Sequence, residues 1–182
     1  MSLVIIEQEF SSPLTANDIV SPAEKTRTCM EIYGAHPRRH YLAHGGLHCM
    51  CVFDAPDAEA VRSAFRLADS DLPKGIWAAM VHPENVTDPG EAPVLQSPDL
   101  RFVLVERVFA DPVNYAGIKV AEDVGASSAD LRAVRHLRSY FSSNRRRMVC
   151  VYGAPDVEAV IKVHRQAGVP FDRAWGAELV VH

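Results

Sequence analysis

Several features that would assign the chain to a familiar functional class are missing. It contains no apolar run of the ~20 residues needed to cross a bilayer, and its N-terminus lacks the basic start and cleavage region of a signal peptide. Its four cysteines form no CxxC pair. Basic residues are not in excess, since 19 lysines and arginines against 23 aspartates and glutamates give a formal net charge of −4. No strong catalytic motif is present.

These absences predict a cytoplasmic protein with free thiols that uses neither a membrane nor nucleic acid as a partner. Tandem RNA-recognition modules would share the element order described below, but they carry stacking aromatic residues in a glycine-containing third strand. Residues 47–53 and 147–152 do not match that pattern. The sequence therefore favours a small molecule or a metal ion as the partner, and it leaves further homo-oligomerisation open.

The clearest positive feature is an internal repeat. Residues 51–61 and 150–160 are identical at eight of eleven positions with a constant offset of 99, and the same offset pairs Glu7 with Glu106. One register without gaps predicts a tandem duplication. The expected segments are a first repeat over 1–82, a proline-rich linker over 83–99 and a second repeat over 100–182.

Hydrophobic periodicity and turn residues predict the order βαββαβ in each repeat. In the first repeat we expect a strand over 3–10, a helix from an N-cap at Ser21 to about Tyr33, strands over 38–44 and 47–54, a helix opened by Pro56, and a strand over 76–82. In the second we expect strands over 101–109, 137–142, 147–153 and 174–181, with helices over 117–131 and 155–167. This order predicts an α+β protein of two ferredoxin-like units, each with both helices on one face of its sheet.

The predicted hairpin around Gly45-Gly46 sorts side chains onto two faces. Alternation places His40 opposite Cys51 on one face, while Met50 takes the other. We expect the Met50 face to carry the helices, because its counterpart in the second repeat is the core aliphatic Val149. The uncovered apolar faces would then pack sheet to sheet as an internal pseudo-dimer of the dimeric α+β barrel type. The ligand-pocket residues expected on this uncovered face are Glu7, Leu42, Cys51, Phe53, Glu106, Phe141, Cys150 and Tyr152.

A group of imidazoles and thiols on this hairpin indicates a possible metal site. Imidazole and thiolate ligands suit borderline or soft ions, here nickel or zinc, and cross-strand neighbours are close enough to share one ion. The expected ligands are His40, His44, Cys49 and Cys51. The alternative is that the cysteines are small core residues and the histidines are hydrogen-bonded or exposed near the turn. The second repeat has Ser139, Ser143 and Met148 at three of these positions, so such a site would be confined to one half.

Glu7 and Glu106 lie in strands of the central type, where a carboxylate costs energy unless it is paired. Each could act as a proton acceptor or a metal ligand. The alternative is an ion pair with an arginine such as Arg39 or Arg138, or exposure at the end of the sheet.

Three stretches, residues 138–141, 148–156 and 164–170, resemble a bacterial family of nickel-binding-like proteins with a ferredoxin fold, domain of unknown function 4242. The resemblance implies a tandem, fused-dimer member of a family whose single units pair as dimers. It also implies nickel binding, without assigning ligands. The first repeat departs from the pattern, because it has Phe65 where the second has His164.

Two functions are consistent with these observations. The first is binding of a small ligand or a transition metal at the face between the two sheets, for metal storage, sensing or delivery. The alternative is a cofactor-free α+β barrel enzyme, monooxygenase-like or isomerase-like, that acts on a small molecule in the same cleft. The identity of the ligand or substrate is left open.

Overall fold

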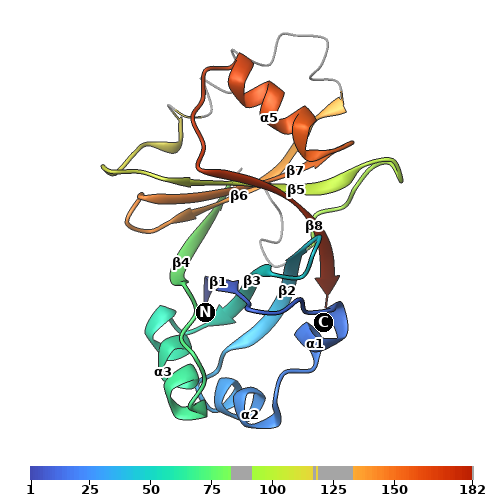
Figure 1. Ribbon diagram of the computed structural model, residues 1–182. Helices are drawn as coiled ribbons and strands as arrows, with labels where there is room; N and C mark the ends of the chain where they lie inside the picture. The colour runs from blue at the N-terminus through green and yellow to red at the C-terminus, as the bar shows by residue number, and fades with distance from the viewer. Residues whose placement is uncertain (83–91, 117, 119–132, 182) are drawn as a thin grey trace. The chain divides into compact units, whose positions relative to one another are not determined.

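The computed structural model describes residues 1–82, 92–116, 118 and 133–181 (Figure 1). The chain divides into two compact units, which are described separately: unit 1 is Met1–Ala79 with Glu178–His182, and unit 2 is Met80–Ala177. The helix expected over 117–131 and part of the expected linker fall outside the described residues. Within the described part of the chain, no helix has both the length and the apolar character needed to span a membrane.

Unit 1 is an antiparallel sheet with helices against one face (Figure 1). Its elements are β1 (Ser2–Glu9), α1 (Ala16–Val20), α2 (Glu24–Ile32), β2 (His36–Ala43), β3 (His48–Ala55), α3 (Ala58–Ala68) and β4 (Gly75–His82), of which the residues up to Ala79 belong to unit 1. Strand β1 pairs with both β3 and β4, and β3 pairs with β2, so the strand order is β4-β1-β3-β2. This is the ferredoxin-like arrangement.

Unit 2 repeats the same pairing. Its described elements are β5 (Arg101–Val108), β6 (Arg135–Ser142), β7 (Arg147–Ala154), α5 (Val157–Gln166) and β8 (Arg173–Val181), of which the residues up to Ala177 belong to unit 2. Strand β5 pairs with β7 and β8, and β7 pairs with β6, which gives the order β8-β5-β7-β6. The prediction of an α+β chain built from two ferredoxin-like units is confirmed.

Side-chain caps explain where the helices begin. Asp57 accepts a hydrogen bond from the Ala60 backbone N–H at 2.8 Å at the start of α3, and Asp156 caps α5 in the same way. Helix α1 was not expected from the sequence; it begins at a capping box between Thr15 and Asp18. Helix α1 ends at Val20 with Ser21 as its C-cap, and the N-cap position of α2 is Ala23, so the prediction that Ser21 caps α2 is wrong.

The turn between β2 and β3 differs from the expected two-residue loop. The Gly46 N–H donates to the Ala43 carbonyl at 2.8 Å, so the turn begins one residue early and His44 lies within it. Gly46 has a φ of +70°, and a Cβ there would collide with the Leu14 backbone. The Leu14 N–H in turn donates to the Gly46 carbonyl at 2.9 Å, which fixes the segment leading into α1 against the hairpin.

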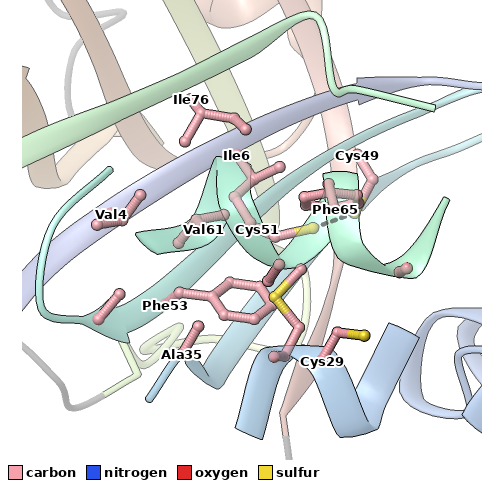
Figure 2. Packing of buried hydrophobic residues seen from close by; sticks show 14 of the residues in the cluster. Val4, Ile6, Cys29, Ala35, Cys49, Cys51, Phe53, Val61, Phe65 and Ile76 are labelled. Atoms are coloured by element: carbon pink, nitrogen blue, oxygen red, sulfur yellow. Dashed lines mark hydrogen bonds between the residues drawn. The ribbon is translucent and has the colours of Figure 1, made fainter. Parts of the chain in front are cut away.

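The helices cover the face opposite to the one predicted. In unit 1, Cys51 and Phe53 pack in one cluster with Val61 and Phe65 of α3 and with residues of α2 (Figure 2). In unit 2, Phe141, Cys150 and Tyr152 likewise share a cluster with Val160 of α5. The sequence misled because both faces of β3 and β7 are apolar, so alternation separates two faces without saying which one the helices cover.

Candidate functional site

Three potential metal ligands meet on the helix-covered face of unit 1. His40 on β2 pairs with Cys51 on β3, and Cys49 lies two residues before Cys51 on the same face. Each side chain offers one ligand atom, and these atoms all lie within 4.8 Å of one another. His40, Cys49 and Cys51 are 4%, 0% and 3% exposed, respectively. We call His40, Cys49 and Cys51 the thiol–imidazole cluster.

The two thiols of the cluster interact directly. The Sγ atoms of Cys49 and Cys51 are 3.6 Å apart, and the Cys51 thiol donates to Gln8 Oε1 at 3.5 Å. Figure 2 shows both cysteines within the packed core of unit 1. The hydrogen bond with Cys49, burial and the nearby Cys49 charge raise the pKa of Cys51 well above the usual value for a thiol. Without a cation beside it, Cys51 is therefore a neutral thiol.

A cavity of about 350 Å³ reaches the cluster from the surface of unit 1. His40 and Cys51 both line it, together with apolar side chains from the sheet and the three helices, such as Ile6, Ile19 and Phe65. The volume lies within the range of small-molecule sites. The cavity thus gives an ion or a small molecule a route to two members of the cluster.

The remaining residues expected in the two sites are dispersed. His44 is exposed at the turn and is not part of the cluster. Leu42 and Phe53 belong to the helix-covered core. Glu7 pairs with Met50 in the ladder and so lies on the opposite face, and Glu106 holds the same position in unit 2. The eight residues of the predicted ligand pocket therefore do not share one face.

Both glutamates bind a tryptophan that the sequence analysis did not single out. Trp77 Nε1 donates to Glu7 Oε1 at 2.9 Å, and Trp175 Nε1 donates to Glu106 Oε1 at 2.7 Å. Arg173 adds an ion pair to Glu106 at 2.9 Å. The chain has only two tryptophans, one near the end of each repeat. Their similar positions in the two repeats could have marked them as equivalent residues. Their offset is 98 rather than 99, so alignment at one fixed offset misses the match.

In unit 2 an arginine lies beside the sulfur atoms. Gln8 pairs with Cys49 in unit 1, and Arg107 pairs with Met148 at the same point of the unit 2 ladder. Arg107 is 2% exposed, and its Nη1 atom lies 3.9 Å from both Met148 Sδ and Cys150 Sγ. The offset of 99 already pairs Gln8 with Arg107, but only the structure brings the guanidinium to the thiol.

Other polar groups complete this region of unit 2. Ser139 Oγ donates to Cys150 Sγ at 3.1 Å, and His136 Nε2 lies 2.8 Å from Ser139 Oγ. Arg107 Nη2 lies 3.1 Å from His164 Nδ1. Burial above all, and then the charges of Arg107 and His136, lower the pKa of His164 to about 4. His164 is therefore neutral near pH 7 and accepts the arginine's hydrogen bond.

Part of unit 2 matches a known protein family. Residues 104–175 match the family described as nickel responsive proteins, SCO4226-like. The matched segment is less than half of the chain and lies within unit 2, so it does not include the thiol–imidazole cluster. The match supports the predicted relationship to nickel-associated proteins in part. No curated protein matches the sequence.

Solved structures resemble the whole chain. A protein described as a candidate chlorite dismutase is 14% identical, with a TM-score of 0.52 over 99% of this chain and 94% of its own. Chlorite dismutase from Candidatus Nitrospira defluvii, in complex with imidazole, is 12% identical, with a TM-score of 0.51 over 96% of this chain and 90% of its own. At such identities the likeness shows the fold alone, and it confirms the predicted α+β barrel class.

Proposed function

We propose that the protein binds a divalent transition metal ion, nickel or zinc, through His40, Cys49 and Cys51 of unit 1. The observation that carries this proposal is the convergence of three buried ligand atoms within 4.8 Å of one another. One imidazole and two thiolates form a donor set that suits borderline and soft ions. Metal storage, sensing or delivery would use such a site.

The spacing of the two sulfur atoms supports a shared ion. Two thiolates bound to one tetrahedral zinc at about 2.3 Å lie about 3.8 Å from each other. The Sγ atoms of Cys49 and Cys51 are 3.6 Å apart, so both could bind one ion with little movement of the strand. His40 pairs with Cys51 across the ladder and would supply the third ligand from β2.

The charge of the complex suits its buried position. A divalent ion with two thiolates and a neutral imidazole has no net charge, which avoids the large cost of burying an unpaired ion. The thiol protons of Cys49 and Cys51 would leave when the metal binds. The cavity that reaches His40 and Cys51 would provide the path for the ion.

The proposal also covers the predicted family and location. We regard the chain as a tandem member of the domain of unknown function 4242 family, in which the metal site of this kind is confined to unit 1. The shared ferredoxin-like pairing of both units and the nickel-responsive family match in unit 2 support this. All four cysteines are free, as a cytoplasmic metal site with thiolate ligands requires.

The enzyme hypothesis stays a prediction. Its support is the likeness of fold to chlorite dismutases, and one fold hosts many activities. The metal proposal has named ligands in addition to fold, and we therefore prefer it.

Titration of the reduced protein, purified without a histidine tag, tests metal binding directly. We expect one nickel or zinc ion per chain, measured by competition with a chromophoric chelator and by elemental analysis. Cys49→Ala, Cys51→Ala or His40→Ala should each weaken binding by more than about a hundredfold, because a direct ligand should matter more than a group that only orients one.

Two other buried cysteines serve as matched controls. Cys29→Ala removes a thiol from the same core of unit 1, and Cys150→Ala removes the unit 2 counterpart of Cys51. Both should retain the affinity of the native chain. Equal losses in the controls, or affinity no better than micromolar in the native chain, would contradict the proposal.

A further inference from the structure

The thiol–imidazole cluster would supply three ligands to a metal ion. Among the residues that the structure describes, the cluster contains one histidine and two cysteines. Structural zinc sites usually have four protein ligands, whereas sites that act on other molecules have three and keep one position for an exogenous ligand. Gln8 Oε1 lies 3.5 Å from Cys51 Sγ, but an amide oxygen suits hard ions better than one already held by thiolates.

The cavity of unit 1 borders this position. Two of the three ligands, His40 and Cys51, line its wall, so an ion held by the cluster would be in contact with the space. The volume of about 350 Å³ corresponds to roughly a dozen water-sized groups. A molecule with one or two rings would fill it.

The lining has a mostly apolar interior, with the Gln8 amide beside the cluster, and a polar and charged rim. Ile6, Phe53 and Phe65 are buried in the interior near the cluster. The charged residues of the lining are exposed and lie on α1 and α2: Asp18, Arg27 and Glu31. A molecule bound next to the metal would therefore contact hydrocarbon on most of its surface, and only its outer end would meet charge.

We propose that the metal centre keeps an open position toward this cavity, and that the cavity binds a neutral, apolar molecule whose aromatic nitrogen fills that position. This inference rests on the proposed metal binding by the cluster. A divalent ion with two thiolates is already neutral, so an anionic donor would leave a net charge in an apolar cavity, whereas a neutral nitrogen would not. Aromatic nitrogen also suits the borderline ions that the cluster favours.

Cobalt(II) is a suitable probe, because it binds zinc-type sites and its visible ligand-field bands report the donor set. We expect cobalt to produce thiolate charge-transfer bands in the native chain. Isoquinoline should then shift the ligand-field bands in a saturable manner. Naphthalene has the same shape without the nitrogen and should cause no shift.

Variants that fill the cavity without touching the cluster complete the test. Ile19 and Val20 are half-buried wall residues of α1. Ile19→Trp should leave cobalt binding within about twofold of the native chain and weaken isoquinoline binding by at least about tenfold, because the ring would occupy its space. Val20→Trp is a second variant with the same expectation, should the first fail to fold.

The outcomes separate the two proposals. Cobalt bands that do not respond to isoquinoline in the native chain, or that respond in the tryptophan variants as strongly as in the native chain, overturn an open position that faces the cavity and leave metal binding intact. Absence of cobalt binding overturns the proposed function and this inference together.

Discussion

At equivalent positions beside the sulfur atoms, unit 1 has a neutral side chain and unit 2 has a cationic one. In unit 1, Gln8 lies beside the two thiols, in a cluster with the donor set of a metal site. In unit 2, the guanidinium of Arg107 lies 3.9 Å from a thioether and a thiol at the same point of the ladder. One fold therefore presents sulfur atoms to a fixed protein cation in one unit and, as we propose, to an exchangeable metal ion in the other.

The difference has an electrostatic consequence. At 4 Å, two unit charges interact by about 4 kcal/mol when the effective dielectric constant is about 20. A metal ion beside Arg107 would meet that repulsion, and it would also lack two ligands, since Ser139 and Met148 replace His40 and Cys49. Unit 2 can therefore keep the fold without binding a metal there.

The largest effect that we expect is the response of metal affinity to pH. Both thiols must lose a proton, so affinity should rise by up to about a hundredfold per pH unit near neutrality, or about 10⁴-fold over two units. Because the pKa of Cys51 is raised by Cys49 and by burial, the rise should continue above the ordinary thiol range. Chelator competition at several pH values measures this.

Proton release on addition of zinc to weakly buffered protein gives an independent measurement. Release should be unchanged in Cys150→Ala, because all three proposed ligands lie in unit 1 and Cys150 lies in unit 2. Affinity that does not vary with pH would show that thiolates are not the ligands.

Conversion of unit 1 to the charge pattern of unit 2 should have the next largest effect. Gln8→Arg places a guanidinium beside Cys49 and Cys51, and metal affinity should fall by about a thousandfold from the repulsion described above. Gln8→Met has a similar length without the charge and should bind almost as the native chain does. Thermal melting of the metal-free variants checks that both are folded. A Gln8→Arg protein whose metal affinity is within tenfold of the native value would refute the proposed electrostatic difference between the two units.

The fold was largely predictable from sequence, because its signals are local. The pairing of His40 with Cys51 followed from alternation around the glycine turn, and the helices after Pro56 and Pro155 from hydrophobic periodicity after a proline. Which face the helices cover is a tertiary property, since Met50 and Cys51 are both acceptable core residues.

The candidate site was predictable only in part, for the same reason. The predicted register correctly placed His40, Cys49 and Cys51 on one face of the hairpin. We expected that face to be uncovered, whereas the helices cover it. His44 was included because the turn was placed one residue late. The cavity could not have been predicted at all, because its α1 wall depends on the contact between Leu14 and Gly46, which are distant in the sequence.

The smallest effect concerns His164, whose counterpart at the offset of 99 is Phe65. Its pKa of about 4 in the folded chain lies below the usual 6.5, so the unfolded chain takes up a proton first as the pH falls. Stability from the neutral imidazole is therefore complete above pH 6.5 and is lost between pH 6.5 and 4, by about 3 kcal/mol in all.

His164→Phe introduces the residue of unit 1 and should remove this acid-dependent loss, because phenylalanine has no proton to bind. Urea unfolding of the native chain and the variant from pH 7 to pH 4 measures it, and the two stability curves should draw closer together as the pH falls. Removal of the imidazole also takes an acceptor from Arg107, so the variant should be less stable at pH 7 than the native chain. Parallel curves would mean that His164 does not control the acid response of unit 2.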